Sequence, residues 1–250
     1  MSAIVEKICR YPVKGLSPDV LESVELAVGA GLPHDRRFAI AHGGEWRERG
    51  GWMPKRHFLN LMTNERLAAL QTAFDAETGV LTISRKGRQV ARGDITQPIG
   101  RALIDQFVAA YMQGKAVGTP HIVEQPGVMF GDTAEPLVSI VNLASVGDLE
   151  RVIRRPVDPL RFRGNIMIDG VRPWAEADWI GREIAIGTAR LKIVEAIGRC
   201  AATNVDPATG ERDMNIPKSL MTGFRHADCG VYARTVQAGS LSVGDSIDLI

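Results

Sequence analysis

Cys200 lies in a segment whose residue types could support thiolate chemistry. The apolar alternation of residues 191–197 predicts a strand that breaks at Gly198, just before the thiol. Arg199 sets a fixed positive charge beside Cys200, and such surroundings favour the thiolate, which attacks electrophiles or binds a soft metal. The alternative is that Cys200 is a small apolar residue packed at the end of a strand. The residues alone leave both interpretations open.

Basic residues also stand at other turns and strand entrances. Lys14 lies on a predicted bend before Gly15, and Arg36 and Arg37 precede a predicted strand at residues 38–41. The planar guanidinium group of arginine can bind an anion through two parallel hydrogen bonds. Such a pair is more commonly a solvated rim whose charges contribute little. An anion site is therefore one of two interpretations for these residues.

A basic, loop-like stretch over residues 47–56 is accompanied by two aromatic side chains, Trp46 and Trp52. Basic residues next to aromatic ones can bind nucleic acid. However, Glu45 and Glu48 lie among them, and the formal net charge of the whole chain is only +1. No global field therefore draws the chain to nucleic acid or to a membrane, and we expect neither as a partner.

The totals indicate an ordinary globular protein of one large domain or two small ones, with 250 residues, 45% of them hydrophobic and 24% charged. Its three cysteines, Cys9, Cys200 and Cys229, do not make a disulfide framework, which favours a reducing compartment. Residues 1–14 lack a signal-peptide core, and no apolar stretch approaches the ~20 residues of a membrane span. We expect a cytoplasmic protein.

Short strands separated by turns dominate the predicted secondary structure. We predict strands at 3–11, 20–28, 38–41, 81–84, 137–141, 166–168, 183–186, 191–197, 231–237 and 246–250. This pattern predicts an α+β fold that is mostly β and contains a β-barrel. The lack of regular βαβ alternation argues against a doubly wound sheet. The irregular stretch 114–131, with several glycines and prolines, predicts a boundary between two parts of the chain.

Three helices are expected among these strands. The first begins near Asn64, with Leu67, Leu70 and Phe74 on one face, and Asn64 is a candidate cap. The second begins at Pro98 and the third at Ser145. The expected apolar face of the second helix is Ile99, Leu103, Phe107 and Ala110, and that of the third is Val146, Leu149 and Ile153.

Several separated motifs together resemble one family. Gly198-Arg199-Cys200-Ala201-Ala202-Thr203-Asn204-Val205-Asp206-Pro207 resembles the signature of the MOSC domain, named for the C-terminal region of molybdenum-cofactor sulfurases. Phe162-Arg163-Gly164-Asn165, the segment from Trp174 to Trp179, and residues 239–245 are similar to its other hallmarks. Tyr11-Pro12-Val13-Lys14-Gly15 and Asp35-Arg36-Arg37-Phe38 resemble the N-terminal β-barrel domain that precedes many MOSC domains. The resemblance covers essentially the whole chain and extends to mitochondrial amidoxime reducing components and their bacterial counterparts.

The resemblance implies a MOSC β-barrel, a smaller preceding β-barrel-like domain and a few peripheral helices, with domains at 1–116 and 117–250. It also implies a molybdenum cofactor of the molybdopterin form, whose metal Cys200 would ligate as a soft thiolate. Lys14, Arg36, Arg163 and Arg199 would hold the anionic cofactor, and Asn165 would face the pterin edge. Further cofactor candidates are Ser139, Asn142 and Ser145. Gly15 replaces a small hydroxyl residue of the amidoxime reductases, and Gly164 replaces the usual proline.

The implied activity is the reduction of N-hydroxylated or N-oxide compounds, small molecules that receive electrons from a separate partner protein of the ferredoxin, flavodoxin or reductase type. The chain has no segment like a pyridoxal phosphate domain and no cysteine set for an iron–sulfur cluster. His34, His57 and Asp206 are candidate proton donors, and His226 with Cys229 is interpreted as structural, because two ligands do not make a zinc site. The alternatives are a sulfur carrier with a persulfide on Cys200 and a non-catalytic cofactor carrier.

Overall fold

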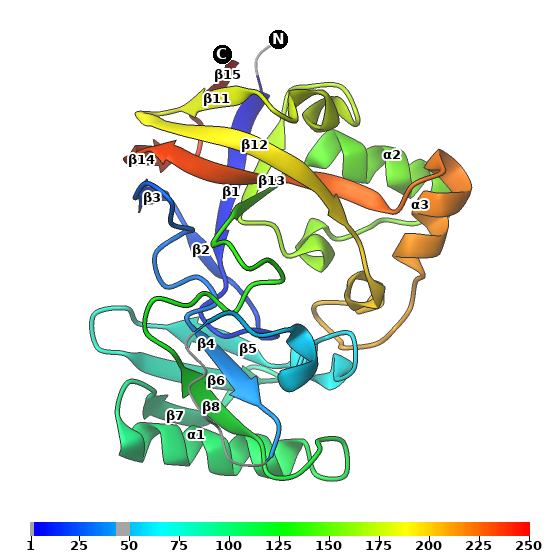
Figure 1. The fold of residues 1–250 in the computed structure, drawn as a ribbon. Helices are drawn as coiled ribbons and strands as arrows, with labels where there is room; N and C mark the ends of the chain where they lie inside the picture. The colour runs from blue at the N-terminus through cyan, green and yellow to red at the C-terminus, as the bar shows by residue number, and fades with distance from the viewer. Residues whose placement is uncertain (1–2, 44–50) are drawn as a thin grey trace.

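The computed structural model describes residues 3–43 and 51–250, which form two lobes (Figure 1). One lobe contains the first strand and nearly all elements from β9 onward, and the other contains β4 to β8 with α1. The predicted boundary between residues 116 and 117 stays a prediction. Backbone pairing crosses it in four places, because β1 pairs with β10 and β15, β3 with β14 and β4 with β8.

The first lobe is built on a closed β-barrel. Its strands follow the order β10-β9-β13-β12-β11-β15-β1, and β1 also pairs with β10, which closes the ring and confirms the expected fold class. β2 (Asp19–Leu21) continues the sheet beyond β1. The barrel strands are β1 (Ala3–Arg10), β9 (Val138–Asn142), β10 (Ile166–Asp169), β11 (Glu183–Ile186), β12 (Ala189–Gly198), β13 (Asp228–Gln237) and β15 (Ser246–Leu249).

The barrel contains one parallel βαβ unit, which the sequence analysis did not predict. β9 and β10 run parallel, and α2 (Leu143–Ile153) connects them. All five residues of β9 are buried, which is typical of a parallel strand covered on both faces. As predicted, Val146 and Leu149 are buried on α2. The helix is capped by Asn142, whose side chain accepts from the backbone N–H of Ala144, and not by Ser145.

The second lobe has its own apolar core beneath small sheets. β4 (Phe38–Ala41) pairs with β8 (His121–Glu124), and β5 (Gln71–Phe74), β6 (Val80–Arg85) and β7 (Arg88–Asp94) form a meander. α1 (Pro98–Tyr111) packs on β7 and β8 (Figure 1). β3 (Ser23–Leu26) pairs with β14 (Gly239–Ser242) and connects this part of the chain to the barrel.

The helix predicted from Asn64 to Phe74 is wrong in length and type. Residues Glu65–Ala69 form a short 3₁₀ helix, η2, and Phe74 reaches the core from strand β5. The side chain of Asn64 does not cap this helix, because its oxygen accepts from Asn60 and its amide donates to the carbonyl of Lys115. The apolar spacing therefore arose from a turn followed by a strand.

The apolar face predicted for α1 is also wrong. Ile99 is 80% exposed and Leu103 is 52% exposed, whereas Gly100, Ile104 and Val108 are buried. The reason is a close approach between α1 and β7. A Cβ at Gly100 would lie 2.0 Å from the carbonyl oxygen of Asp94, so only glycine lets the helix turn this side toward the strand.

Several elements were not predicted at all. They are β5, β7, β8, β14 and α3 (Ile216–Phe224), together with η1 (Lys55–His57), η3 (Pro159–Phe162), η4 (Ala175–Trp179) and η5 (Ala201–Asn204). α3 begins with the side chain of Asn215 accepting from the N–H of Lys218. It packs against α2 and η5, so it supports the segment that follows Cys200. No helix among the described residues is long and apolar enough to cross a membrane.

Two helical glycines give a matched test of this packing. Gly100→Ala should lower the free energy of unfolding by about 2 kcal/mol or more, because its methyl group overlaps backbone. Gly147→Ala in α2 should raise it by about 0.5–1 kcal/mol, because no atom lies within 4 Å and alanine favours helix. Urea denaturation of both variants measures these changes. Shifts of the same sign would contradict the close approach of α1 to β7.

Candidate functional site

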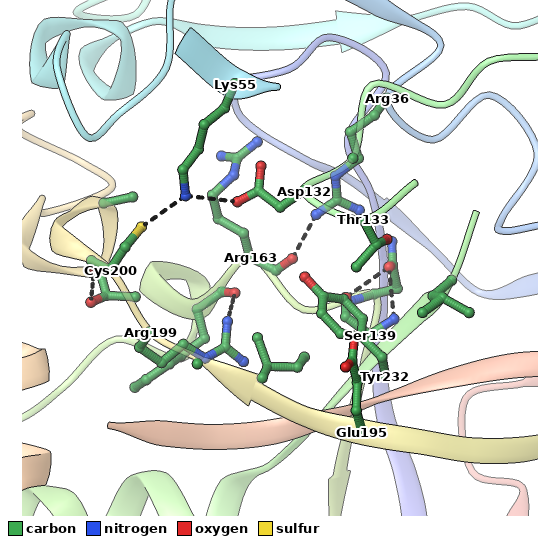
Figure 2. Close-up of a pocket in the computed structure, with 18 of the residues that line it drawn as sticks. Arg36, Lys55, Asp132, Thr133, Ser139, Arg163, Glu195, Arg199, Cys200 and Tyr232 are labelled. Carbon is green, nitrogen blue, oxygen red and sulfur yellow. Dashed lines mark hydrogen bonds and ion pairs between the residues drawn. The ribbon is translucent and has the colours of Figure 1, made fainter. Parts of the chain in front are cut away.

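A cavity of about 440 Å³ lies where the two lobes meet, and we call it the cationic pocket (Figure 2). Six basic side chains and two acidic ones line it, although the chain as a whole is nearly neutral. The volume is that of a site for a small molecule or cofactor. Of the residues predicted from the sequence, the pocket brings together Lys14, Arg36, Ser139, Arg163, Asn165, Arg199 and Cys200.

Cys200 lies just beyond the end of β12, and it lines the pocket. Only Arg199 separates it from the end of β12, and η5 begins at the next residue. Its carbonyl accepts from the N–H and the hydroxyl of Thr203. Its side chain is half-buried. Its Sγ lies 3.7 Å from Nζ of Lys55, which reaches across from the second lobe (Figure 2). The sulfur therefore faces a cation that the sequence analysis had not connected with it.

Lys55 and Lys14 hold one carboxylate between them. Nζ of Lys14 lies 2.7 Å from Oδ1 of Asp132, and Nζ of Lys55 lies 3.4 Å from Oδ2 of the same residue. Burial lowers the pKa of Lys14, and the ion pair with Asp132 opposes this. Although burial alone would raise it, the two ammonium groups lower the pKa of Asp132 to about 2. Asp132 is therefore ionised and fixed in place.

Two guanidinium groups carry most of the unbalanced charge. Nη1 of Arg163 donates to the carbonyl of Leu16 at 2.8 Å. Nε of Arg199 donates to the carbonyl of Cys229 at 2.7 Å, and its Nη1 donates to that of Phe162 at 2.8 Å. Within residues 3–43 and 51–250, neither arginine forms an ion pair. Burial lowers the pKa of Arg163 to about 10 and also lowers that of Arg199, because removal from water disfavours the charged guanidinium.

Ser139 and Asn165 line the pocket but are occupied with each other. The side-chain oxygen of Asn165 accepts from the N–H of Ser139 at 3.1 Å and from its hydroxyl at 2.8 Å. The amide nitrogen of Asn165 donates to the carbonyl of Cys9 at 3.1 Å. These bonds connect β1, β9 and the entrance of β10, so both residues stabilise the floor of the pocket.

The structure does not bring Asn142 and Ser145 to the pocket. Both bind the buried carboxylate of Glu176, Asn142 through its amide at 2.9 Å and Ser145 through its hydroxyl at 2.9 Å. Glu176 belongs to the segment between Trp174 and Trp179 that the sequence analysis took as a family hallmark. Its role here is to connect η4 to the beginning of α2, and a buried carboxylate needs such donors.

The candidate proton donors also lie elsewhere. Asp206 forms an ion pair with Arg161 at 3.0 Å and accepts from the backbone of its own turn. His34 contacts Arg37 at 3.1 Å, and neither it nor His57 is among the described residues that line the pocket. The basic loop predicted at 47–56 is described only from residue 51 onward, and Glu45, Trp46, Arg47 and Glu48 lie outside the described residues.

Sequence reasoning missed several polar lining residues, among them Lys55, Asp132, Glu195 and Tyr232. Lys55 was assigned only to a basic, loop-like stretch, and Asp132 lay just beyond a stretch interpreted as a boundary. Glu195 and Tyr232 stand opposite each other on β12 and β13. Strand alternation could have found Tyr232, which follows the inward-facing Val231, but it places Glu195 on the same face as Ile193. A register shift between Ile193 and Glu195 turns Glu195 outward, and the sequence does not show this shift.

The remaining two thiols, Cys9 and Cys229, are buried. Burial raises the pKa of Cys9 to about 11 and that of Cys229 to about 12, so both stay protonated. Nδ1 of His226 accepts from the N–H of Asp228, which supports the structural interpretation of this pair. Among the described residues, no group of three histidine, cysteine or acidic side chains could hold a metal.

The two glycine departures fit their surroundings. Gly15 has a φ of +86°, where a side chain is strained, and a Cβ would lie 3.2 Å from Leu67. A Cβ at Gly164 would lie 2.6 Å from a methyl group of Val141 in the barrel wall. Glycine at both positions therefore lets the flanking Lys14 and Arg163 sit close to neighbouring chain segments.

Two family models match this chain, and between them they account for nearly all of it. The MOSC domain matches residues 125–248, and the MOSC N-terminal beta barrel domain matches residues 2–119. The chain therefore belongs to the MOSC proteins, which confirms the resemblance seen in its motifs.

Curated relatives and solved structures add more distant similarities. Mitochondrial amidoxime-reducing component 1 of Homo sapiens is 32% identical over 135 residues, which are 49% of this chain and 39% of the human protein. Mitochondrial amidoxime reducing component 2 of Bos taurus is 32% identical over 122 residues, 44% of this chain and 36% of the bovine protein. The chain thus spans less than half the length of these relatives. The YUAD protein of Bacillus subtilis covers 100% of this chain and 96% of its own, with 12% identity and a TM-score of 0.48.

The contact between Lys55 and Cys200 predicts a kinetic effect. In the cofactor-free protein at pH 7, Lys55→Gln should slow alkylation of Cys200 by iodoacetamide about three- to tenfold, because the ammonium 3.7 Å from Sγ attracts negative charge on the reacting sulfur. Lys192→Gln on the exposed side of β12 is the matched control and should react as the wild type does. Equal rates in both variants would contradict the contact.

The position of Asp132 predicts a pH dependence of stability. Its folded-state pKa of about 2 lies below the ordinary 3.8, so its contribution is present above pH 3.8 and is lost as the pH falls through 2. Because Asp132 is 45% exposed, Asp132→Asn should cost only about 1 kcal/mol at pH 7. Urea denaturation from pH 7 to pH 2.5 should show the difference narrowing at the acid end. A difference that grows toward low pH would contradict the ion pair.

Proposed function

We propose that the chain binds a molybdenum cofactor in the cationic pocket and reduces N-hydroxylated or N-oxide compounds. The observation that carries the proposal is the combination of two partly buried guanidinium groups with the half-buried thiol of Cys200. These groups belong to Arg163 and Arg199, which form no ion pair with any residue that the structure describes. An anionic ligand would balance the first two, and a soft metal would suit the third.

The donor set fits this cofactor. Its phosphate and pterin edge need hydrogen-bond donors and positive charge, and the six basic groups of the pocket supply both. Its metal is already held by sulfur, and the pocket offers one half-buried thiol, since Cys9 and Cys229 are buried and protonated. Cys200 would therefore ligate the metal, and Lys14, Arg36, Arg163 and Arg199 would bind the anionic part.

When bound, the cofactor would supply two-electron reduction chemistry, and the residues of the chain would bind and orient the cofactor and the substrate. Lys55 places a positive charge 3.7 Å from the sulfur, where it stabilises negative charge that develops on the reacting oxygen of a substrate. Asp132 holds the ammonium of Lys55 in this position through an ion pair. Glu195 and Tyr232 line the pocket from paired positions on β12 and β13 and would contact the substrate.

The substrate class and the electron donor belong to the same proposal. The names of the curated relatives describe amidoxime reduction in mitochondria, and amidoximes are N-hydroxylated compounds. We assign this chain a separate electron-transfer protein as its donor. We also assign it a cytoplasmic location, because its three thiols are free in the structure and a reducing compartment keeps thiols free.

A second candidate function is a sulfur carrier with a persulfide on Cys200. The contact between Lys55 and Cys200 is compatible with this function, since the ammonium of Lys55 would stabilise the negative charge of a persulfide on Cys200. It leaves the charges of Arg163 and Arg199 without a role. A non-catalytic cofactor carrier would use all of these residues and differs only in lacking turnover.

The test is the content of molybdenum and released pterin in the wild type and in Cys200→Ala, expressed in parallel in cells that make the cofactor. We expect about one metal per chain in the wild type and a loss of at least tenfold in the variant, because one metal–thiolate bond is removed. Cys229→Ala is the matched control, since this buried thiol lies outside the donor set and should keep the metal.

Absence of both metal and pterin from the wild type would overturn the proposal. Mass spectrometry after exposure to a cysteine desulfurase then tests the sulfur carrier, which requires a persulfide on Cys200. Full metal content without reduction of any N-hydroxylated or N-oxide compound by a chemical electron donor would favour the carrier function instead.

A further inference from the structure

We propose that Tyr11 is a positioning residue, whose aromatic ring holds Arg36 and Arg163 together as one anion receptor. Tyr11 is fully buried and directly follows β1. The guanidinium carbon of Arg36 lies 4.5 Å from the ring centre, and that of Arg163 lies 4.2 Å from it. The inference rests on the proposed function only for the identity of the anion, because the contacts exist in the protein itself.

Two like charges beside one ring require a physical explanation. Cations are attracted to the negative face of an aromatic ring, and the attraction grows when the partners are removed from water. Arg36 also forms an ion pair with Asp35, and this carboxylate raises the pKa of Arg36 although burial opposes it. Arg163 has no carboxylate partner among the described residues, and the charge of Arg36 is one of the causes that lower its pKa. The ring of Tyr11 therefore compensates chiefly Arg163.

The backbone supports this assignment independently. Arg36 and Arg163 both have left-handed φ angles, +47° and +52°. Such angles are uncommon for residues other than glycine and persist only where the surrounding structure enforces them, often at functional sites. Both residues thus adopt a strained backbone, and in both the side chain ends over the same ring.

Tyr11 is also tied to the turn that presents Arg36. Its N–H donates to Oδ1 of Asp35 at 2.7 Å, and its carbonyl accepts from the N–H of Arg36 at 2.7 Å. Nη2 of Arg36 in turn donates to the carbonyl of Arg163 at 2.8 Å (Figure 2). The ring and these backbone bonds define one unit that spans three separate segments of the chain.

The hydroxyl group has no part in this unit. It is buried and has no hydrogen-bond partner among the described residues, so its loss of water is not compensated by a hydrogen bond. A ring that acts by itself explains why the residue keeps its position despite this cost. It also separates the proposal from one in which the hydroxyl binds the ligand, because phenylalanine keeps the ring and removes the hydroxyl.

The experiment compares Tyr11→Phe with Tyr11→Met and Tyr11→Leu in the cofactor-free protein. Two quantities are measured: the affinity for inorganic phosphate, and the ring-current shifts of the Arg36 and Arg163 side-chain protons in NMR spectra. We expect Tyr11→Phe to match the wild type within about twofold and to keep the shifts. The two aliphatic variants should lose the shifts and bind phosphate about tenfold more weakly, since two cation–π contacts are removed.

The matched control is Phe74→Leu, which removes a buried ring from the core of the second lobe without touching the pocket. It should lose stability but keep the affinity for phosphate. Aliphatic variants that bind phosphate as the wild type does would overturn the proposal. So would a Tyr11→Phe variant as weak as Tyr11→Leu, or a wild type without affinity for phosphate. If an aliphatic variant fails to fold, a Tyr11→Phe variant that binds phosphate clearly more weakly than the wild type would still overturn the proposal.

This experiment is independent of the cofactor. Loss of the proposed function would appear as a wild type without molybdenum and pterin, whereas phosphate binding by the same protein could still follow the ring at position 11. Conversely, the wild type could contain molybdenum and pterin while the cofactor-free aliphatic variants bind phosphate as tightly as it does. This result would refute the positioning role of Tyr11 and leave the proposed function standing.

Discussion

The pairing of β1 with β10 is the constraint on which the rest of the structure depends. It closes the barrel, and it does so with a strand from the opposite end of the chain. Because β1 lies between β15 and β10, its exit is fixed at the point where the two lobes meet. Tyr11 follows β1 directly, and Lys14, a few residues further on, lines the pocket. The register of one pair of strands therefore sets the position of residues that no local sequence preference could place.

The pocket contains several positive charges that are partly buried before any ligand binds. Carboxylates balance four of its cations, Lys14, Arg36, Lys55 and Arg161. Among the described residues, Arg163 and Arg199 instead contact backbone carbonyls and aromatic rings. Carbonyl groups orient a guanidinium but leave its charge largely uncompensated. The protein thus tolerates an electrostatic cost within a fold whose stability comes from apolar cores elsewhere. An incoming anion would remove that cost.

Much of the barrel followed from alternation in the sequence, because inward and outward residues must alternate along a strand. Strands at 38–41 and 183–186 were predicted with the bounds observed, and Cys200 was placed correctly at a strand exit. The rotation of α1 could not be predicted, since it depends on a backbone approach at Gly100. Asn142 and Ser145 were misjudged because their partner, Glu176, lies about thirty residues away in sequence. Lys55 was missed for the same reason, as its contact with Cys200 spans 145 residues.

The closed ring also determines the order in which a growing chain can fold. Ala3 pairs with Ile247, so β1 can complete its sheet only after residues more than two hundred positions further along have been made. The second lobe has its own core and lies almost entirely within the first half of the chain, so it can form earlier. Contacts between such distant residues slow folding, because a long loop must close before any bond forms. Barrel closure, and with it the assembly of the anion receptor, is therefore expected after the core of the second lobe has formed.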